Sequence, residues 1–169
     1  MRWGELKREK CSVARTISVI GDRWTLLILR DCFLRVRRFE EFERRLGITR
    51  HVLANRLKKL VAAGVLARRP YQERPRRYEY RLTQKGLELH PVLLTIAHWG
   101  DRHMAGAKGP PLLYEHRACG HDFAPVVTCS ECGIHMGWLS ARETAFITKI
   151  ATTFGCPTTP IVVREWRHI

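Results

Sequence analysis

Apolar side chains recur at helical spacing in three early stretches of the chain. The pattern predicts a helix over residues 12–20, a second from residue 23 to about residue 34, and a third over residues 39–46. Glycine follows the first and third stretches, where it commonly ends a helix, and Asp22 is a good N-cap for the second. The first part of the chain is therefore expected to be mainly helical.

A fourth helix follows the third after only a short turn that contains Gly47. Thr49 has the side chain of an N-cap, and Gly64 supplies a stop, so this helix is expected over about residues 49–63. A helix, a short glycine turn and a second, capped, basic helix form the pattern of a helix-turn-helix motif.

The pattern then changes from a helical period to strict alternation. Residues 65–69 and 77–82 alternate apolar and charged side chains, which predicts two strands that each have one wet face. The basic loop between them contains two prolines, so the pair reads as a hairpin wing centred on about residues 70–77. A longer helix is expected from residue 84 to about residue 104, interrupted near Pro91. The predicted fold class is mainly α with a small β-hairpin: a winged helix-turn-helix.

Positive charge is concentrated in the first 110 residues, which hold 25 Lys and Arg against 11 Asp and Glu. The remaining 59 residues balance at five of each sign, so the first part carries the whole formal net charge of +14. A basic half with a helix-turn-helix and a wing is typical of a protein that binds nucleic acid.

The polar face of the fourth helix and the tip of the wing are the candidate DNA-binding surfaces. On a helical wheel, the face that would lie on the core holds Leu53, Leu57, Leu60 and Val61, and the opposite face is polar and basic. Asparagine can read adenine and arginine can read guanine, whereas lysines suit phosphates. The alternative is a basic face that is merely solvated. The residues expected to contact DNA are Thr49, Arg50, His51, Asn55, Lys58, Lys59, Arg74, Arg76 and Arg77.

Several short motifs along residues 11–103 make this sequence similar to one known family. These motifs lie at residues 11–16, 20–24, 28–30, 38–39, 46–48, 53–60, 63–66, Pro75, 78–83, Gly86 and 99–101. Through them the chain resembles the HxlR-type winged helix-turn-helix transcriptional regulators of bacteria.

The resemblance implies a homodimer joined mainly through the first helix and the helix after the wing. Two recognition helices would then be spaced for a pseudo-palindromic operator. Val92, Leu93, Ile96 and Trp99 are available for that interface, although each could equally belong to an ordinary core. Several members of the family sense oxidants or electrophiles through a cysteine at the place of Cys11. The alternative is that Cys11 is a small residue at a helix start.

The neutral end of the chain contains two versions of one short motif, in which a ligand-type residue is followed by two spacers, cysteine and glycine. Together the two motifs supply the four nitrogen and sulfur ligands of a tetrahedral structural zinc site. The predicted ligands are His116, Cys119, Cys129 and Cys132, and His121 or His135 could replace His116. Free thiols or a redox disulfide are the alternatives.

The predicted organisation has three parts. Residues 1–105 form the winged helix-turn-helix and dimerisation domain, residues 106–113 a linker, and residues 114–169 a zinc-ribbon-like appendage with a helix over about residues 141–152. The role of the appendage stays open, since it could extend the dimer, touch DNA or form an effector pocket.

The expected function is that of a sequence-specific regulator of transcription, acting as a repressor on double-stranded DNA, with a small-molecule or oxidant effector as a further partner. A nonspecific nucleic-acid-binding protein is the alternative. The chain starts without a secretory signal and carries no apolar run of membrane-spanning length, so a cytoplasmic protein with no membrane partner is expected. We find no catalytic motif and expect no enzyme activity.

Overall fold

The computed structural model describes residues 5–133 and residue 135, and these divide into two compact units. The division falls between Ala97 and His98, within helix α6 (His90–Met104). The sequence places the end of its first domain later, at residue 105, and that boundary stays a prediction.

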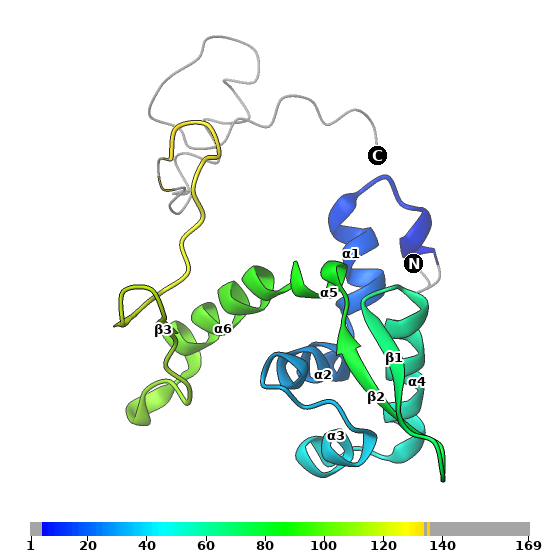
Figure 1. Ribbon diagram of the computed structural model, residues 1–169. Coiled ribbons are helices and arrows are strands. Elements are labelled where there is room, and N and C mark those ends of the chain that lie inside the picture. The colour runs from blue at the N-terminus through cyan, green and yellow to red at the C-terminus, as the bar shows by residue number, and fades with distance from the viewer. Residues whose placement is uncertain (1–4, 134, 136–169) are drawn as a thin grey trace. The chain divides into compact units, whose positions relative to one another are not determined.

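The helices of the first unit begin and end where the hydrophobic pattern and the capping residues indicate. After a single 3-10 turn, η1 (Leu6–Arg8), come α1 (Ser12–Ile20), α2 (Arg23–Phe33), α3 (Phe39–Leu46) and α4 (Arg50–Ala62) (Figure 1). All four ranges agree with the predicted ones to within a residue or two. The mainly helical class with a small β-hairpin is confirmed.

Local capping chemistry explains this agreement. The Asp22 carboxylate accepts hydrogen bonds from the backbone N–H groups of Trp24 and Thr25 at the start of α2. The Thr49 hydroxyl accepts one from Val52 at the start of α4. Gly47 takes a left-handed φ of 62° between α3 and α4, a conformation that favours glycine and sets the sharp turn of the motif.

The wing is longer than the sequence indicates. Strands β1 (Leu66–Gln72) and β2 (Arg77–Leu82) pair antiparallel, and only residues 73–76 are left for the turn. Pro70 lies inside β1, opposite Tyr78, although its ring makes it look like a loop residue in the sequence. Because β1 is the outer strand of the sheet and is irregular between Pro70 and Gln72, the missing N–H is tolerated there.

The inner strand, β2, also pairs with the connector between α2 and α3. The Tyr80 N–H donates to the Arg37 carbonyl at 2.8 Å, and Arg38 forms a bridge with Glu79. These contacts tie the base of the wing to the helices, while the hairpin tip projects beyond them in Figure 1.

The helical stretch after the wing is split into two helices, as predicted, but the break comes slightly earlier. Helix α5 (Gln84–Leu87) is separated from α6 by Glu88 and Leu89. Pro91 lies in the first turn of α6, where a proline loses no intrahelical hydrogen bond.

The hydrophobic core of the first unit lies among α2, α3, α4 and the base of the wing. Its fully buried side chains include those of Ile28, Leu29, Phe42, Leu53, Leu57, Leu60, Val65 and Leu66. The inward face predicted for the fourth helix is therefore confirmed, and this packing fixes how α4 presents its other face.

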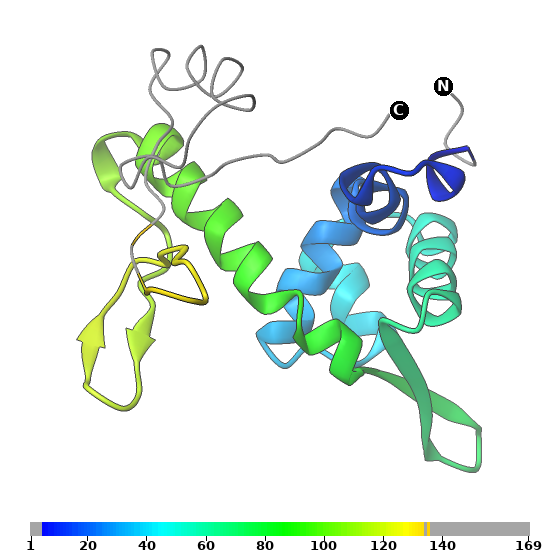
Figure 2. The same ribbon diagram turned by 90° about the horizontal axis from the view of Figure 1, so that it is seen from above.

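The described residues of the second unit form little regular structure after α6. A 3-10 turn, η2 (Gly106–Lys108), is followed by a short hairpin of β3 (Glu115–His116) and β4 (His121–Asp122), visible as two small arrows in Figure 2. The helix predicted over residues 141–152 lies outside the described residues.

Candidate nucleic-acid interface

Helix α4 turns one face to the core and the other to solvent. Leu53, Leu57 and Leu60 are at most 1% exposed. The polar residues that the sequence assigns to DNA contact on this helix are all exposed: His51, Asn55, Lys58 and Lys59. Helix α4 can therefore stay packed on the core while its polar side chains enter a groove of DNA.

An ion pair fixes α4 against the start of α2. The Arg56 guanidinium donates to both carboxylate oxygens of Asp22, at 2.7 and 3.0 Å. Burial alone would raise the pKa of Asp22, but the hydrogen bonds and charge of Arg56, together with the amides of Thr25 and Trp24, outweigh burial and hold that pKa below its ordinary value. Asp22 therefore caps α2 and anchors α4 at once. Arg56 is a positioning residue that the hydrophobic pattern did not single out.

Arg50 is the first residue of α4 and contacts side chains of the preceding helix, α3. Its guanidinium donates to Glu43 at 2.7 Å and lies 4.9 Å from the centre of the Phe39 ring, yet the side chain stays 66% exposed. Thr49, just before it, uses its hydroxyl to cap α4. Both predicted DNA contacts are thus accessible, and both also have a structural partner inside the protein.

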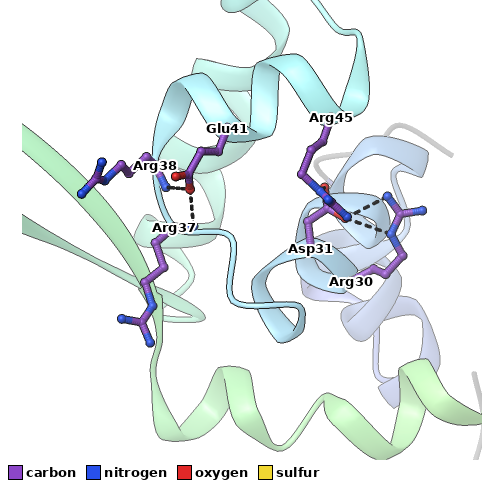
Figure 3. A network of polar contacts seen from close by, with 6 residues as sticks. All are labelled: Arg30, Asp31, Arg37, Arg38, Glu41 and Arg45. Carbon is purple, nitrogen blue, oxygen red and sulfur yellow. Dashed lines mark hydrogen bonds and ion pairs between the residues drawn. The ribbon is translucent and has the colours of Figure 1, made fainter. Parts of the chain in front are cut away.

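Two carboxylates stabilise the helices that support α4 (Figure 3). The Asp31 carboxylate is fully buried and accepts from Arg30 at 2.9 Å and from Arg45 at 3.2 Å. The Glu41 carboxylate accepts from the backbone N–H groups that precede α3, those of Arg37 and Arg38. Because a buried carboxylate needs partners of opposite charge, Asp31 links α2 to α3 at a defined place.

Three arginines surround the tip of the wing. Arg74, Arg76 and Arg77 are all exposed, as predicted for phosphate or minor-groove contact. Arg76 lies 5.6 Å from the centre of the Tyr78 ring, and Arg68 lies 3.5 Å from the same ring. The aromatic ring thus holds part of the positive charge of the wing near the hairpin surface.

A shallow hollow of about 390 Å³ lies between α4 and the wing. It is lined by Ala54, Lys58, Val61, Arg68 and Tyr80. Burial raises the pKa of the Tyr80 hydroxyl, with Arg68 opposing that rise and Glu40 adding to it. Arg68 was not among the predicted contact residues, although its place in an alternating basic strand could have indicated it.

A comparison with known protein families shows which family this chain belongs to. Residues 19–108 match the model of the HxlR-like helix-turn-helix family. The chain belongs to this family.

Similar proteins and solved structures agree with that assignment. The uncharacterized HTH-type transcriptional regulator Rv3095 of Mycobacterium tuberculosis is 43% identical over 122 residues, which cover 72% of this chain and 77% of the relative. The crystal structure of PA1607, described as a candidate transcription factor, has a TM-score of 0.70 at 36% identity and covers 81% of this chain and 94% of that one. The protein is a DNA-binding transcriptional regulator.

A further similar solved structure is that of the redox regulator HypR in its oxidized form. It has a TM-score of 0.51 at 34% identity and covers 55% of this chain and 97% of its own. Among residues 5–133 and 135 of this chain, no helix combines the length and the apolar character needed to cross a bilayer.

Two cysteines of this HxlR-like chain lie in contrasting places. Cys11 is partly exposed just before α1, and the nearby Arg15 guanidinium donates to the Lys10 carbonyl and the Ser12 hydroxyl, each at 3.4 Å. Cys32 is buried in the core, where burial and then the charge of Asp31 raise its pKa to about 12. A thiol with such a pKa is almost entirely protonated at neutral pH and is a poor nucleophile.

The four predicted zinc ligands lie in two separate turns of the second unit. We call residues 116–120 the first Cys turn and residues 129–133 the second Cys turn. In the first, His116 Nδ1 lies 3.3 Å from Cys119 Sγ. In the second, the backbone N–H groups of Cys132 and Glu131 lower the pKa of Cys129. No group of three or more His, Cys, Asp or Glu side chains converges into a metal site within the described part of the chain.

Proposed function

We propose that this regulator binds a pseudo-palindromic operator as a homodimer and represses transcription from it. Helix α4 would enter the major groove, and the tip of the wing would reach the neighbouring minor groove or phosphates. The observation that carries the proposal is the division of α4 into a buried apolar face and an exposed polar face, next to a hairpin with three exposed arginines at its tip.

The exposed side chains divide by chemistry into readers of bases and binders of phosphate. Asn55 can bond adenine bidentately, and Arg50 and His51 lie in the first turn of α4, the end that contacts base edges in this motif. We assign Lys58, Lys59, Arg74, Arg76 and Arg77 to phosphates or the minor groove. Thr49 contributes through its cap, which orients the first turn.

Two sets of variants test this division. Changing Asn55 to Ala should weaken binding to the preferred operator by about 1–3 kcal/mol and leave random DNA nearly unaffected. Reversing Arg76 and Arg77 to Glu should weaken binding to both and lower the salt slope by about 2. Fluorescence anisotropy at several salt concentrations measures both effects, and Lys7 with Arg8, both exposed on η1, gives a matched charge-reversal control.

The operator itself comes from selecting fragments of genomic DNA with the purified protein. A protein that protects no unique site and is competed equally by random DNA would be a nonspecific binder instead. Equal loss of affinity in the Lys7 and Arg8 control would likewise contradict the assignment of the wing.

The homodimer is supported by apolar side chains that the first unit and α6 leave in solvent. Val13 and Ile17 of α1 are 65% and 41% exposed, and Ile96 and Trp99 of α6 are 47% and 55% exposed. Leu93, by contrast, packs on the core. Surfaces of this kind commonly mark interfaces.

Light scattering at micromolar concentration should give twice the mass of one chain. Changing Ile96 to Glu should give monomers that bind the operator weakly. The same change at Val126, which is 63% exposed and lies in the second unit, should leave the mass unaltered. A monomeric wild type would defeat this part of the proposal.

A redox-sensing form of the same regulator is the second candidate function. It is supported by the likeness to the redox regulator HypR and by the accessibility of Cys11. Mild peroxide or quinone treatment should modify Cys11, as read by peptide mass spectrometry, and should change operator binding. The variant Cys11→Ser should bind DNA equally well before and after treatment, and an unaffected wild type would end the idea.

A further inference from the structure

The two Cys turns have the same backbone design. When the first turn is moved along the chain until His116 falls on Cys129, the antiparallel pair of Glu115 with Asp122 falls on the bridged pair of Thr128 with His135. Both turns are therefore tips of hairpins in one register, and the likeness reaches beyond the spacing of the cysteines.

Hydrogen bonds and backbone angles repeat in the same way. The Gly120 N–H donates to the His116 carbonyl at 2.8 Å, and the Gly133 N–H donates to the Cys129 carbonyl at 2.9 Å. The two glycines have left-handed φ values of 68° and 69°. Each turn thus bends back sharply enough for its first and fourth side chains to lie side by side.

The spacing of the side chains in the first turn suits a metal ion. Bonds of about 2.0–2.1 Å to nitrogen and about 2.3 Å to sulfur at a tetrahedral zinc ion separate the two ligand atoms by about 3.5 Å. His116 Nδ1 and Cys119 Sγ lie 3.3 Å apart, so this pair is already near the distance at which both atoms bind one ion.

We propose that both Cys turns close on one Zn²⁺, with His116, Cys119, Cys129 and Cys132 as its ligands. Each turn supplies two ligands, and no larger group converges among the described residues. Metal binding is therefore coupled to bringing the two turns together, as in other small domains that fold around zinc. The site goes beyond DNA binding, because the family match ends at residue 108.

The side chains around the two Cys turns show why a bound zinc ion would stabilise this segment. No described side chain between residues 110 and 133 is buried, and Phe123, Val126 and Val127 are 39%, 63% and 50% exposed. A short segment without a core commonly relies on a metal or disulfides for stability. Four protein ligands leave no open position, so the ion has a structural role.

Metal analysis of the full chain, purified without chelator under reducing conditions, tests the site. The wild type should contain about one zinc per chain, and Cys119→Ser, Cys129→Ser and Cys132→Ser should each contain less than about 0.2. The matched control, Cys11→Ser, should keep the wild-type content. Replacing zinc by cobalt should give the intense visible bands of a tetrahedral thiolate site in the wild type and in the control.

Variants of the histidines identify the nitrogen ligand. The assignment requires that His116→Asn lose the metal and that His121→Asn and His135→Asn keep it. Loss of metal in His121→Asn or His135→Asn, with retention in His116→Asn, would overturn the choice of His116.

Zinc content below about 0.2 per chain, together with failure to bind cobalt, would overturn the site as a whole. A disulfide between Cys129 and Cys132 in freshly reduced protein would do the same. One zinc per two chains would replace the single-chain site by a shared one. Operator binding, measured on the same samples, separates these outcomes from failure of the DNA-binding proposal.

Discussion

The two units of this chain differ in how many of their described side chains are buried. The first unit buries Phe42, Ile28, Leu53 and their neighbours completely and supports them with a buried carboxylate, Asp31. Among the side chains described in the second unit, none is buried. The difference teaches that the hydrophobic effect specifies the winged helix, whereas the described part of the second unit has no buried core and would need the proposed zinc ion for its stability.

This contrast also divides the functions. The winged helix can present α4 and the wing without any cofactor, because its core and its ion pairs fix those elements. The described part of the second unit contains exposed thiols and imidazoles, and the proposed zinc ion would stabilise their arrangement.

The largest expected difference between the units is in the reactivity of their thiols. With its pKa raised to about 12, Cys32 should react with iodoacetamide at pH 8 at least about 100-fold more slowly than Cys129, whose pKa is lowered. A time course followed by peptide mass spectrometry, with chelator present to free any bound thiol, measures both rates. In urea the rates should converge, and equal rates in the folded protein would contradict the buried position of Cys32.

Removal of apolar groups should affect only the first unit. Leu57→Ala takes away a side chain with no exposed surface and should lower the free energy of unfolding by about 2–5 kcal/mol. Val126→Ala, at a position 63% exposed in the second unit, should change it by less than about 0.5 kcal/mol. Urea unfolding monitored by tryptophan fluorescence measures both. A large loss in Val126→Ala would show that the second unit has a core of its own.

Substitutions at two glycines compare how tightly the backbone is packed in the two units. A Cβ at Gly86 would lie 2.3 Å from the Val65 carbonyl oxygen, so Gly86→Ala should destabilise the first unit by about 1–3 kcal/mol. At Gly100, in the second unit, nothing lies within 4 Å of the added carbon, and Gly100→Ala should stabilise α6 by up to about 1 kcal/mol. Changes of the same sign in thermal unfolding would refute this difference in packing.

The sequence predicts those parts of the molecule that depend on neighbouring residues. Helices α1 and α3 and strand β2 have the predicted bounds, because caps, glycines and the alternation of side chains act locally. The extension of β1 through Pro70 was missed, since only the pairing shows that β1 lies at the edge of the sheet. The break before α6 was predicted near Pro91, slightly too late in the chain. A proline is compatible with the first turn of a helix, so its position does not by itself show where the helix begins.

In the candidate nucleic-acid interface too, the sequence predicts the features that depend on neighbouring residues. Exposure of the polar face of α4 follows from helical period, so Asn55 and Lys58 could be chosen from sequence. The partners of Arg50 and Arg56 could not, because side-chain ion pairs have no periodic signal. Arg56 and Asp22 stand 34 positions apart, and only the packing of α4 on α2 brings them into contact.

That ion pair gives the smallest effect and the sharpest dependence on pH. Asn is a good N-cap, so Asp22→Asn keeps the cap of α2 and removes the charge that pairs with Arg56. Because both partners stay partly exposed to water, the loss at neutral pH should be about 1 kcal/mol. Asp22→Ala removes the cap as well and should lose about 1 kcal/mol more.

The direction of the pH effect follows from the lowered pKa of Asp22. A carboxylate whose pKa is lower in the folded state stabilises the fold above its ordinary pKa of about 3.9, and that contribution is lost as the pH falls through the folded-state value. The difference between the wild type and Asp22→Asn should therefore be full at pH 7 and should shrink below about pH 4 in urea unfolding. A difference that stays constant with pH would mean that the charge of Asp22 does not contribute to folding, so the ion pair with Arg56 would not stabilise the fold. The anchor of α4 would then rest on its buried leucines.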